Sequence, residues 1–156
     1  MPRYYKKKYY KGAGKDKYSV ENTSVLLTTG QTSSGNLFQA AQALVNPTTT
    51  QGMRKVKHLT VSLTTQDTAP TVWWAVVYVP EGYAVNPISA ISGASIYEPN
   101  QFVMSCGVND PNAGPVRIRT PISRNLNSGD SIYLVVGTPN AGLNVQGVCT
   151  YAITLQ

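Results

Sequence analysis

Apolar and polar residues alternate in short runs through most of the chain. The clearest run is 59–64, in which Leu59, Val61 and Leu63 alternate with Thr and Ser. A period of two is the spacing of a β-strand that buries one face. Residues 53–65 are therefore predicted to form a strand. Similar runs between turns rich in Gly, Pro and Asn predict seven more strands, at residues 25–29, 37–45, 72–79, 101–107, 116–120, 131–137 and 145–155.

The alternation changes phase once, because Val56 has the opposite parity from Leu59. One interpretation is a β-bulge near His58 that shifts the phase. The other is that the first half of the strand projects beyond the core and presents Lys55 and Lys57 to a partner. We favour the second interpretation.

Residues 72–79 are apolar throughout and lie between Pro70 and Pro80. Such a run predicts a strand that is covered on both faces, by the opposite sheet and by a loop or another subunit. Trp73 and Trp74 are adjacent, so their side chains should point to opposite faces. One indole is then expected in the core, and the other under a loop or at a subunit contact.

Eight strands without intervening helices predict an all-β protein. A sandwich or barrel is the simplest arrangement, and eight is the number of strands in a jelly roll. The 156 residues divide into a basic N-terminal arm, 1–17, and one β domain, 18–156. Residues 80–99 and 125–130 are expected to be loops. Since no apolar run is long enough to cross a bilayer, we expect no membrane association.

The arm carries the whole net charge of +6, with seven basic residues and one acid, Asp16. We expect it to be disordered when free. Interleaved cations and Tyr rings are typical of segments that bind single-stranded nucleic acid without reading sequence, since cations contact phosphates and rings stack on bases. A solvated tail or an expression remnant is the alternative. The candidate binding residues are Arg3, Tyr4, Tyr5, Lys6, Lys7, Lys8, Tyr9, Tyr10, Lys11, Lys15 and Lys17.

No catalytic or metal-binding pattern is present. His58 is the single histidine and has no carboxylate nearby in sequence, so we expect it at the surface or an interface. Cys106 and Cys149 lack the spacing of a zinc or redox site. We weighed a disulfide between them and favour two reduced, buried thiols. The sequence thus predicts no enzyme, no cofactor and no metal.

Three segments behind the basic arm carry a family resemblance: Met53-Arg-Lys-Val-Lys57, Tyr97-Glu-Pro-Asn-Gln-Phe-Val-Met-Ser-Cys-Gly107 and Ile122-Ser-Arg-Asn-Leu-Asn-Ser-Gly-Asp-Ser-Ile-Tyr-Leu134. They resemble the capsid proteins of circovirus-like, circular single-stranded DNA viruses. The resemblance implies a jelly roll with sheets BIDG and CHEF, the eight predicted strands being B to I in order. It also implies an icosahedral T=1 shell of sixty copies around the genome.

The resemblance also implies which partners this protein has and where it is located. We expect a homo-oligomeric shell in the virion, with single-stranded DNA as cargo and RNA as an alternative in recombinant particles. Lys6, Lys7 and Lys8 form a short basic run of the kind that directs nuclear import, so assembly in a host nucleus is one expectation. The arm uses Lys and Tyr where its relatives use Arg. A cellular single-strand-binding module with a basic tail, and an extracellular jelly-roll ligand or lectin, are the competing interpretations.

The resemblance also predicts a second basic surface. Strands D and G are neighbours in the BIDG sheet, and Arg117 and Arg119 alternate with apolar residues, which places both on the solvent face. We expect this face to line the shell and to contact the genome. Alternatively, it faces outward or pairs with acids of a neighbouring subunit. The candidate residues are Arg54, Lys55, Lys57, Arg117 and Arg119.

Overall fold

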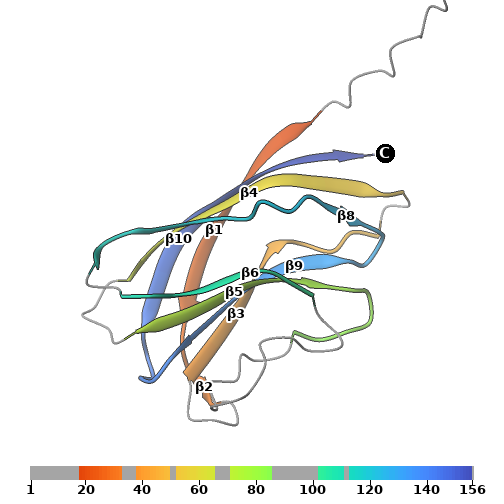
Figure 1. The fold of residues 1–156 in the computed structure, drawn as a ribbon. Coiled ribbons are helices and arrows are strands. Elements are labelled where there is room, and N and C mark those ends of the chain that lie inside the picture. Colours follow the sequence, from red (N-terminus) through yellow and green to blue (C-terminus); the bar gives the residue numbers. More distant parts are fainter. Residues whose placement is uncertain are drawn as a thin grey trace, which may run out of the picture.

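The computed structural model describes residues 18–32, 38–49, 52–65, 71–85, 102–110 and 113–155. The arm, residues 1–17, lies outside this part. Within it, ten strands form two antiparallel five-stranded sheets that pack face to face (Figure 1). Sheet A has the order β1-β10-β4-β7, and β8 also pairs with β4. Its strands are β1 (Ser19–Thr28), β4 (Arg54–Thr65), β7 (Val116–Arg119), β8 (Arg124–Leu126) and β10 (Asn144–Leu155).

Sheet B has the order β2-β3-β9-β5-β6. Its strands are β2 (Gln31–Thr32), β3 (Phe38–Val45), β5 (Val72–Val79), β6 (Phe102–Asn109) and β9 (Ser131–Thr138). With β7 and β8 together taken as strand G, the orders in the two sheets are those of BIDG and CHEF. The predicted all-β jelly roll is confirmed.

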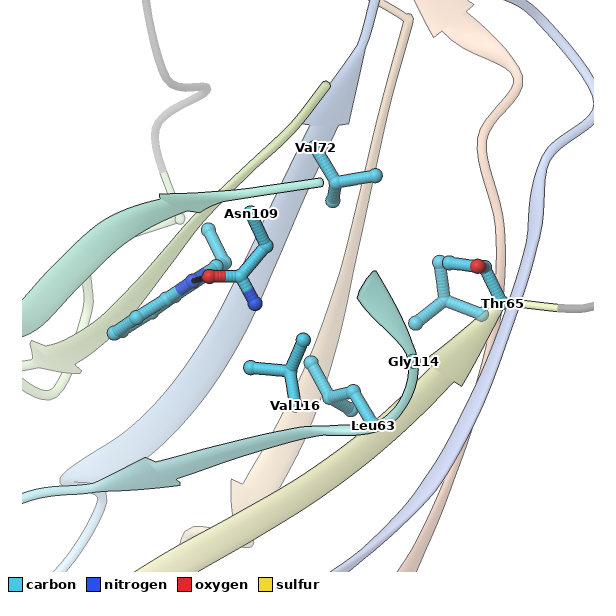
Figure 2. A pocket seen from close by; sticks show the side chains of 8 residues that line it. Leu63, Thr65, Val72, Asn109, Gly114 and Val116 are labelled. Carbon is cyan, nitrogen blue, oxygen red and sulfur yellow. Dashed lines mark hydrogen bonds between the residues drawn. The ribbon is translucent and has the colours of Figure 1, made fainter. Parts of the chain in front are cut away.

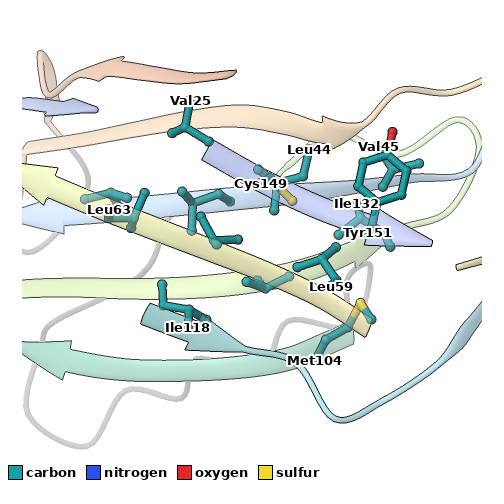
Figure 3. Close-up of a cluster of buried hydrophobic side chains, with 14 of the residues drawn as sticks. Val25, Leu44, Val45, Leu59, Leu63, Met104, Ile118, Ile132, Cys149 and Tyr151 are labelled. Carbon is teal, nitrogen blue, oxygen red and sulfur yellow. The ribbon is translucent and has the colours of Figure 1, made fainter. Parts of the chain in front are cut away.

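Alternating side chains from both sheets fill the space between them (Figure 3). Leu44 and Leu134 of sheet B and Leu59 of sheet A have no exposed surface. A buried side chain of this size contributes about 1.5–3 kcal/mol through removal from water. This cluster is therefore the main source of stability for the sandwich, and it fixes which face of each strand points outward.

Strand β4 contains a β-bulge at His58. Its pairing with β10 shifts register between Thr60 and Lys57, and His58 has a φ of 54°. Val56 is only 1% exposed. The expectation that the first half of this strand projects beyond the core is therefore wrong. The bulge adds a residue to β4, and this returns Val56 to the buried side.

Residues 124–126 form strand β8, although residues 125–130 were expected to be a loop. Leu126 pairs with Arg54 and has no exposed surface. The single apolar residue between two Asn residues gave no periodic signal. Burial of Leu126 and pairing with β4 stabilise a strand that is only three residues long.

Strand β5 is covered on both faces, as predicted. Val76 belongs to the main cluster, whereas Ala75 and Val77 join Val135 in a second cluster on the outer side of sheet B. The two indoles also separate as predicted. Trp74 packs against the main cluster, and its Nε1 donates a 3.3 Å hydrogen bond to Asn109 Oδ1. Trp73 lies on the other face.

Candidate nucleic-acid interface

The register of sheet A places four cations on one surface. Arg119 pairs with Thr60 and Arg117 with Ser62. Beyond the bulge, Ala152 pairs with Lys57 and Thr154 with Lys55. Directly opposed residues of antiparallel strands share a face. Lys55, Lys57, Arg117 and Arg119 therefore all lie on the solvent side of sheet A, and we call this surface the basic face.

The bulge at His58 brings these cations together. Without the extra residue, Lys55 and Lys57 would have the parity of the buried Leu59. With it, both lie on the same side as Thr60 and Ser62 and, through them, Arg117 and Arg119. The two arginines are exposed and the two lysines half-buried.

The basic face contains uncharged polar groups between its cations. One row across the sheet runs from Asn22 through Thr150 and Thr60 to Arg119. Thr150 donates a 2.9 Å hydrogen bond to Asn22 Oδ1. Hydroxyl and amide groups are ordinary partners of phosphate oxygens. The face can therefore bind a phosphate backbone through hydrogen bonds as well as charge.

No described Asp or Glu lies on the basic face. Glu21 has the opposite parity on β1, and its Oε2 accepts a 2.8 Å hydrogen bond from the Tyr151 hydroxyl. The other described acids, Glu81, Asp110 and Asp130, lie outside the strands of sheet A. Within the described part of this subunit, the charge of the face is therefore not offset by a carboxylate on the same surface.

Arg54 does not join the basic face. It has the parity of the buried Val56, and its guanidinium donates hydrogen bonds to the carbonyl oxygens of Asn46 (3.1 Å) and Asp130 (3.2 Å). Both carbonyls belong to segments that flank sheet B. The expectation that five cations share one face is wrong for Arg54, because adjacent residues of a strand point to opposite faces and the bulge places Lys55, not Arg54, on the solvent side. Arg54 links the two sheets instead.

The chain enters sheet A beside the basic face. Tyr18 is the first described residue, and Lys57 Nζ lies 4.6 Å from the centroid of its ring. A cation above an aromatic face is an attractive contact. It fixes the start of β1 against a lysine of the basic face. The eleven candidate residues of the arm lie just before this point, outside the described residues.

The two cysteines differ in environment. Both are free thiols, but Cys149 is buried and Cys106 is exposed. Burial raises the pKa of the Cys149 thiol to about 12. The expectation of two buried thiols is wrong for Cys106, because its side chain points outward from the edge strand β6.

The described residues form a hollow of about 330 Å³ between β1 and β3, lined by Leu26, Gln39 and Ala41 among others. Among the described residues, no three His, Cys, Asp or Glu side chains are grouped to hold a metal ion. His58 is exposed. A cavity of about 20 Å³ opens at one end of the sandwich, lined mainly by apolar groups such as Leu63, Val72 and Val116 (Figure 2). That volume holds about one water molecule.

The described part of the chain also contains no helix with the length and apolar character needed to span a bilayer.

No protein-family model matches the chain, and no curated protein matches its sequence. Among solved structures, a chain from Desmodium yellow mottle tymovirus aligns with 13% sequence identity over 90% of this chain and 89% of its own, with a TM-score of 0.37. An identity and a TM-score this low assign neither a family nor a function.

Proposed function

We propose that this protein is a viral coat subunit that assembles into a small icosahedral shell and packages single-stranded nucleic acid. The main observation behind the proposal is that positive charge continues from the arm onto the basic face. An arm that holds the whole net charge of +6 enters the fold next to Lys57, at the margin of a face with four cations and no described acid. The jelly-roll topology and the resemblance of three segments to circovirus-like capsid proteins support the same role.

The proposed binding is electrostatic and independent of sequence. Cations of the arm and the basic face displace counterions from phosphates, which makes the affinity depend steeply on salt. Tyr rings in the arm stack on unpaired bases. In this arrangement the basic face lines the interior of the shell. The finer proposal is a T=1 shell of sixty copies with single-stranded DNA as its natural cargo, in a virion assembled in the host nucleus.

The role proposed is structural and not enzymatic. A cellular single-strand-binding module would share the basic arm, but it would act as a monomer and should expose aromatic rings for stacking on its sheet. Among the described residues of the basic face, the one aromatic ring is that of Tyr18. This ring is half-buried and in contact with Lys57. This observation favours the coat subunit.

Negative-stain electron microscopy of the purified full chain, with and without a synthetic single strand, tests the proposal. Uniform hollow spheres, together with protection of the strand from nuclease, are the expected result. Dispersed monomers that bind the strand would indicate the cellular module instead. Monomers that bind no nucleic acid would reject both functions.

A further inference from the structure

The bulge in β4 leaves a histidine on the solvent side of sheet A. The pairing of β4 with β10 places His58 and Leu59 together opposite one residue, Tyr151. Leu59 and Tyr151 belong to the core between the sheets (Figure 3), and Leu59 has no exposed surface. His58, by contrast, is exposed. Since β4 has neighbours on both sides in sheet A, the imidazole reaches solvent on the side of the basic face.

His58 lies where the cations of the basic face pass from one strand to the next. The two lysines lie on β4 before the bulge, at Lys55 and Lys57. Beyond the bulge the outward positions of β4 are uncharged, and the cations lie on β7 instead, at Arg117 and Arg119. Alternate residues of one strand are about 7 Å apart, and neighbouring strands about 5 Å apart. The four cations therefore form a line along the sheet, with His58 at its middle.

The elements around His58 carry no described carboxylate toward it. On β10 the outward neighbours are Thr150 and Ala152, and both are uncharged. Residues 120–123, between β7 and β8, are also uncharged. The charged side chains on these elements are all cations: Lys57 on β4, Arg119 on β7 and Arg124 on β8. Within the described part of the subunit, a protonated imidazole at this position has no counter-ion. A bound phosphate supplies one.

We propose that His58 is a further nucleic-acid-binding residue of the basic face, and that its protonation in mild acid strengthens the binding of a single strand. This inference rests on the proposed function and adds a regulation to it. His58 is the single histidine of the sequence. An imidazole changes charge between about pH 5 and 8, a range in which lysine and arginine stay charged. As an imidazolium it places a fifth cation in the line, and both ring nitrogens become donors for phosphate oxygens.

The affinity of the full chain for an oligothymidylate measures this effect, because thymine and phosphodiester groups do not titrate near neutral pH. One added phosphate contact makes the slope of log affinity against log salt more negative by about 0.7. At about 0.1 M salt such a contact corresponds to about fivefold tighter binding. We expect both changes when the pH falls from about 7.5 to about 5.5. Fluorescence anisotropy with a pH-insensitive dye, below the subunit concentration needed for assembly, measures them.

His58→Asn removes the titrating group and is compatible with the bulge, because Asn, like His, tolerates the positive φ of this position. Both the increase in affinity and the change in slope should be lost in this variant. The α-amino group of the chain also titrates, at about pH 8, but it is present in both proteins. The difference between wild type and variant therefore isolates the imidazole.

Two further variants move the histidine within the His58→Asn background. Ser62→His returns an imidazole to the basic face, at an exposed position opposite Arg117. Val108→His is the matched control, since Val108 is 57% exposed on β6 of sheet B, away from the basic face. Only Ser62→His should restore the increase in affinity at acid pH. Circular dichroism checks that each variant is folded.

The outcomes separate this inference from the proposed function. If the wild type binds the strand equally well at both pH values, or if His58→Asn keeps the full increase, the inference is overturned and the coat function stands. If Val108→His restores the increase as well as Ser62→His does, or if neither restores it, the position on the basic face is not the cause and the inference is again overturned. If the wild type binds no strand at either pH, the proposed function fails and this inference fails with it.

Discussion

The hydroxyl of Tyr78 on β5 donates a 2.7 Å hydrogen bond to Oδ2 of Asp130, the residue before β9. The same carboxylate accepts hydrogen bonds from the backbone nitrogens of Asn127 (2.8 Å) and Glu81 (3.1 Å). Asp130 is 4% exposed, and its carbonyl oxygen accepts the hydrogen bond from Arg54 of sheet A. One buried acid thus connects β5 with the turn after β5 and the turn after β8, and its carbonyl adds a bond to Arg54 of β4.

Replacement of this acid should be costly. Asp130→Ala leaves one buried and two part-buried donors without their acceptor, and we expect it to lower the free energy of unfolding by about 3 kcal/mol. Tyr78→Phe removes one of the three bonds and should cost about 1.5 kcal/mol. Urea titrations followed by circular dichroism measure both changes. Equal losses in the two variants would show that the backbone donors contribute little.

The fold should lose stability at alkaline pH through buried tyrosines. Burial and the hydrogen bond to Glu21 raise the pKa of Tyr151 from 10.0 to about 12, and burial also raises the pKa of Tyr78. A raised pKa means that folding favours the neutral phenol. The stabilisation is therefore complete below pH 10 and is lost as the pH rises toward 12. Unfolding midpoints measured across this range should fall. The fall should be shallower in Tyr151→Phe, and an identical slope would exclude Tyr151 as a cause.

Gly107 is required by the ring of Trp74. A Cβ atom at Gly107 would lie 2.6 Å from Cζ2 of that ring, which is closer than any normal contact. Gly107→Ala should therefore displace the indole and cost about 1–3 kcal/mol, with a shift in tryptophan fluorescence. Gly30→Ala is the control, because a Cβ there meets nothing within 4 Å. It should change stability by less than about 0.5 kcal/mol, and similar losses in the two variants would argue against the steric cause.

The two tryptophans should separate folding from assembly. Trp74 packs on the main cluster and bonds to Asn109, so Trp74→Ala should lower the free energy of unfolding by about 3 kcal/mol. Trp73 is half-buried on the outer face of sheet B, and Trp73→Ala should leave a folded subunit that assembles poorly. Thermal unfolding and electron microscopy distinguish the two effects. Two variants that both unfold, or that both assemble normally, would contradict the separation.

The sequence predicted the strands because alternation and short apolar runs depend only on which faces are buried, and the number of strands with the family resemblance predicted the jelly roll. It could not place the bulge, since the parity change between Val56 and Leu59 fits either a bulge or a projecting strand. Only the pairing of Lys57 with Ala152 decides between them. The same bulge determines that Arg54 points between the sheets, whereas the alternation of side chains alone already places Arg54 and Lys55 on opposite faces.

Strand β8 and Cys106 were missed for a different reason. Arg124-Asn-Leu126 is too short to show a period, and it forms a strand because β4 offers an edge beyond β7. Cys106 lies in an apolar run, but β6 is the edge strand of sheet B, and its outward side chains stay accessible there. In both cases the deciding information is which strand lies alongside, and this information is absent from the local pattern.

The salt dependence of single-strand binding should separate the arm from the basic face. Each phosphate contact changes the slope of log affinity against log salt by about −0.7 for single strands. The net charge of the arm therefore predicts a contribution of about −4, which is lost when residues 1–17 are deleted. In the full chain, the double variant Arg117→Gln, Arg119→Gln should make the slope less negative by about 1.4. Fluorescence anisotropy at several salt concentrations measures each slope.

Arg124→Gln is the matched control for the arginine pair, because it removes a cation that does not lie on the basic face. The guanidinium of Arg124 lies 4.1 Å from the centroid of the Tyr78 ring and 5.2 Å from that of Phe102. Provided circular dichroism shows a folded domain, this variant should keep the wild-type slope. If it flattens the slope by about half as much as the double variant does, the effect is one of overall charge. If the double variant keeps the wild-type slope, the strand is bound by the arm and the basic face has another partner.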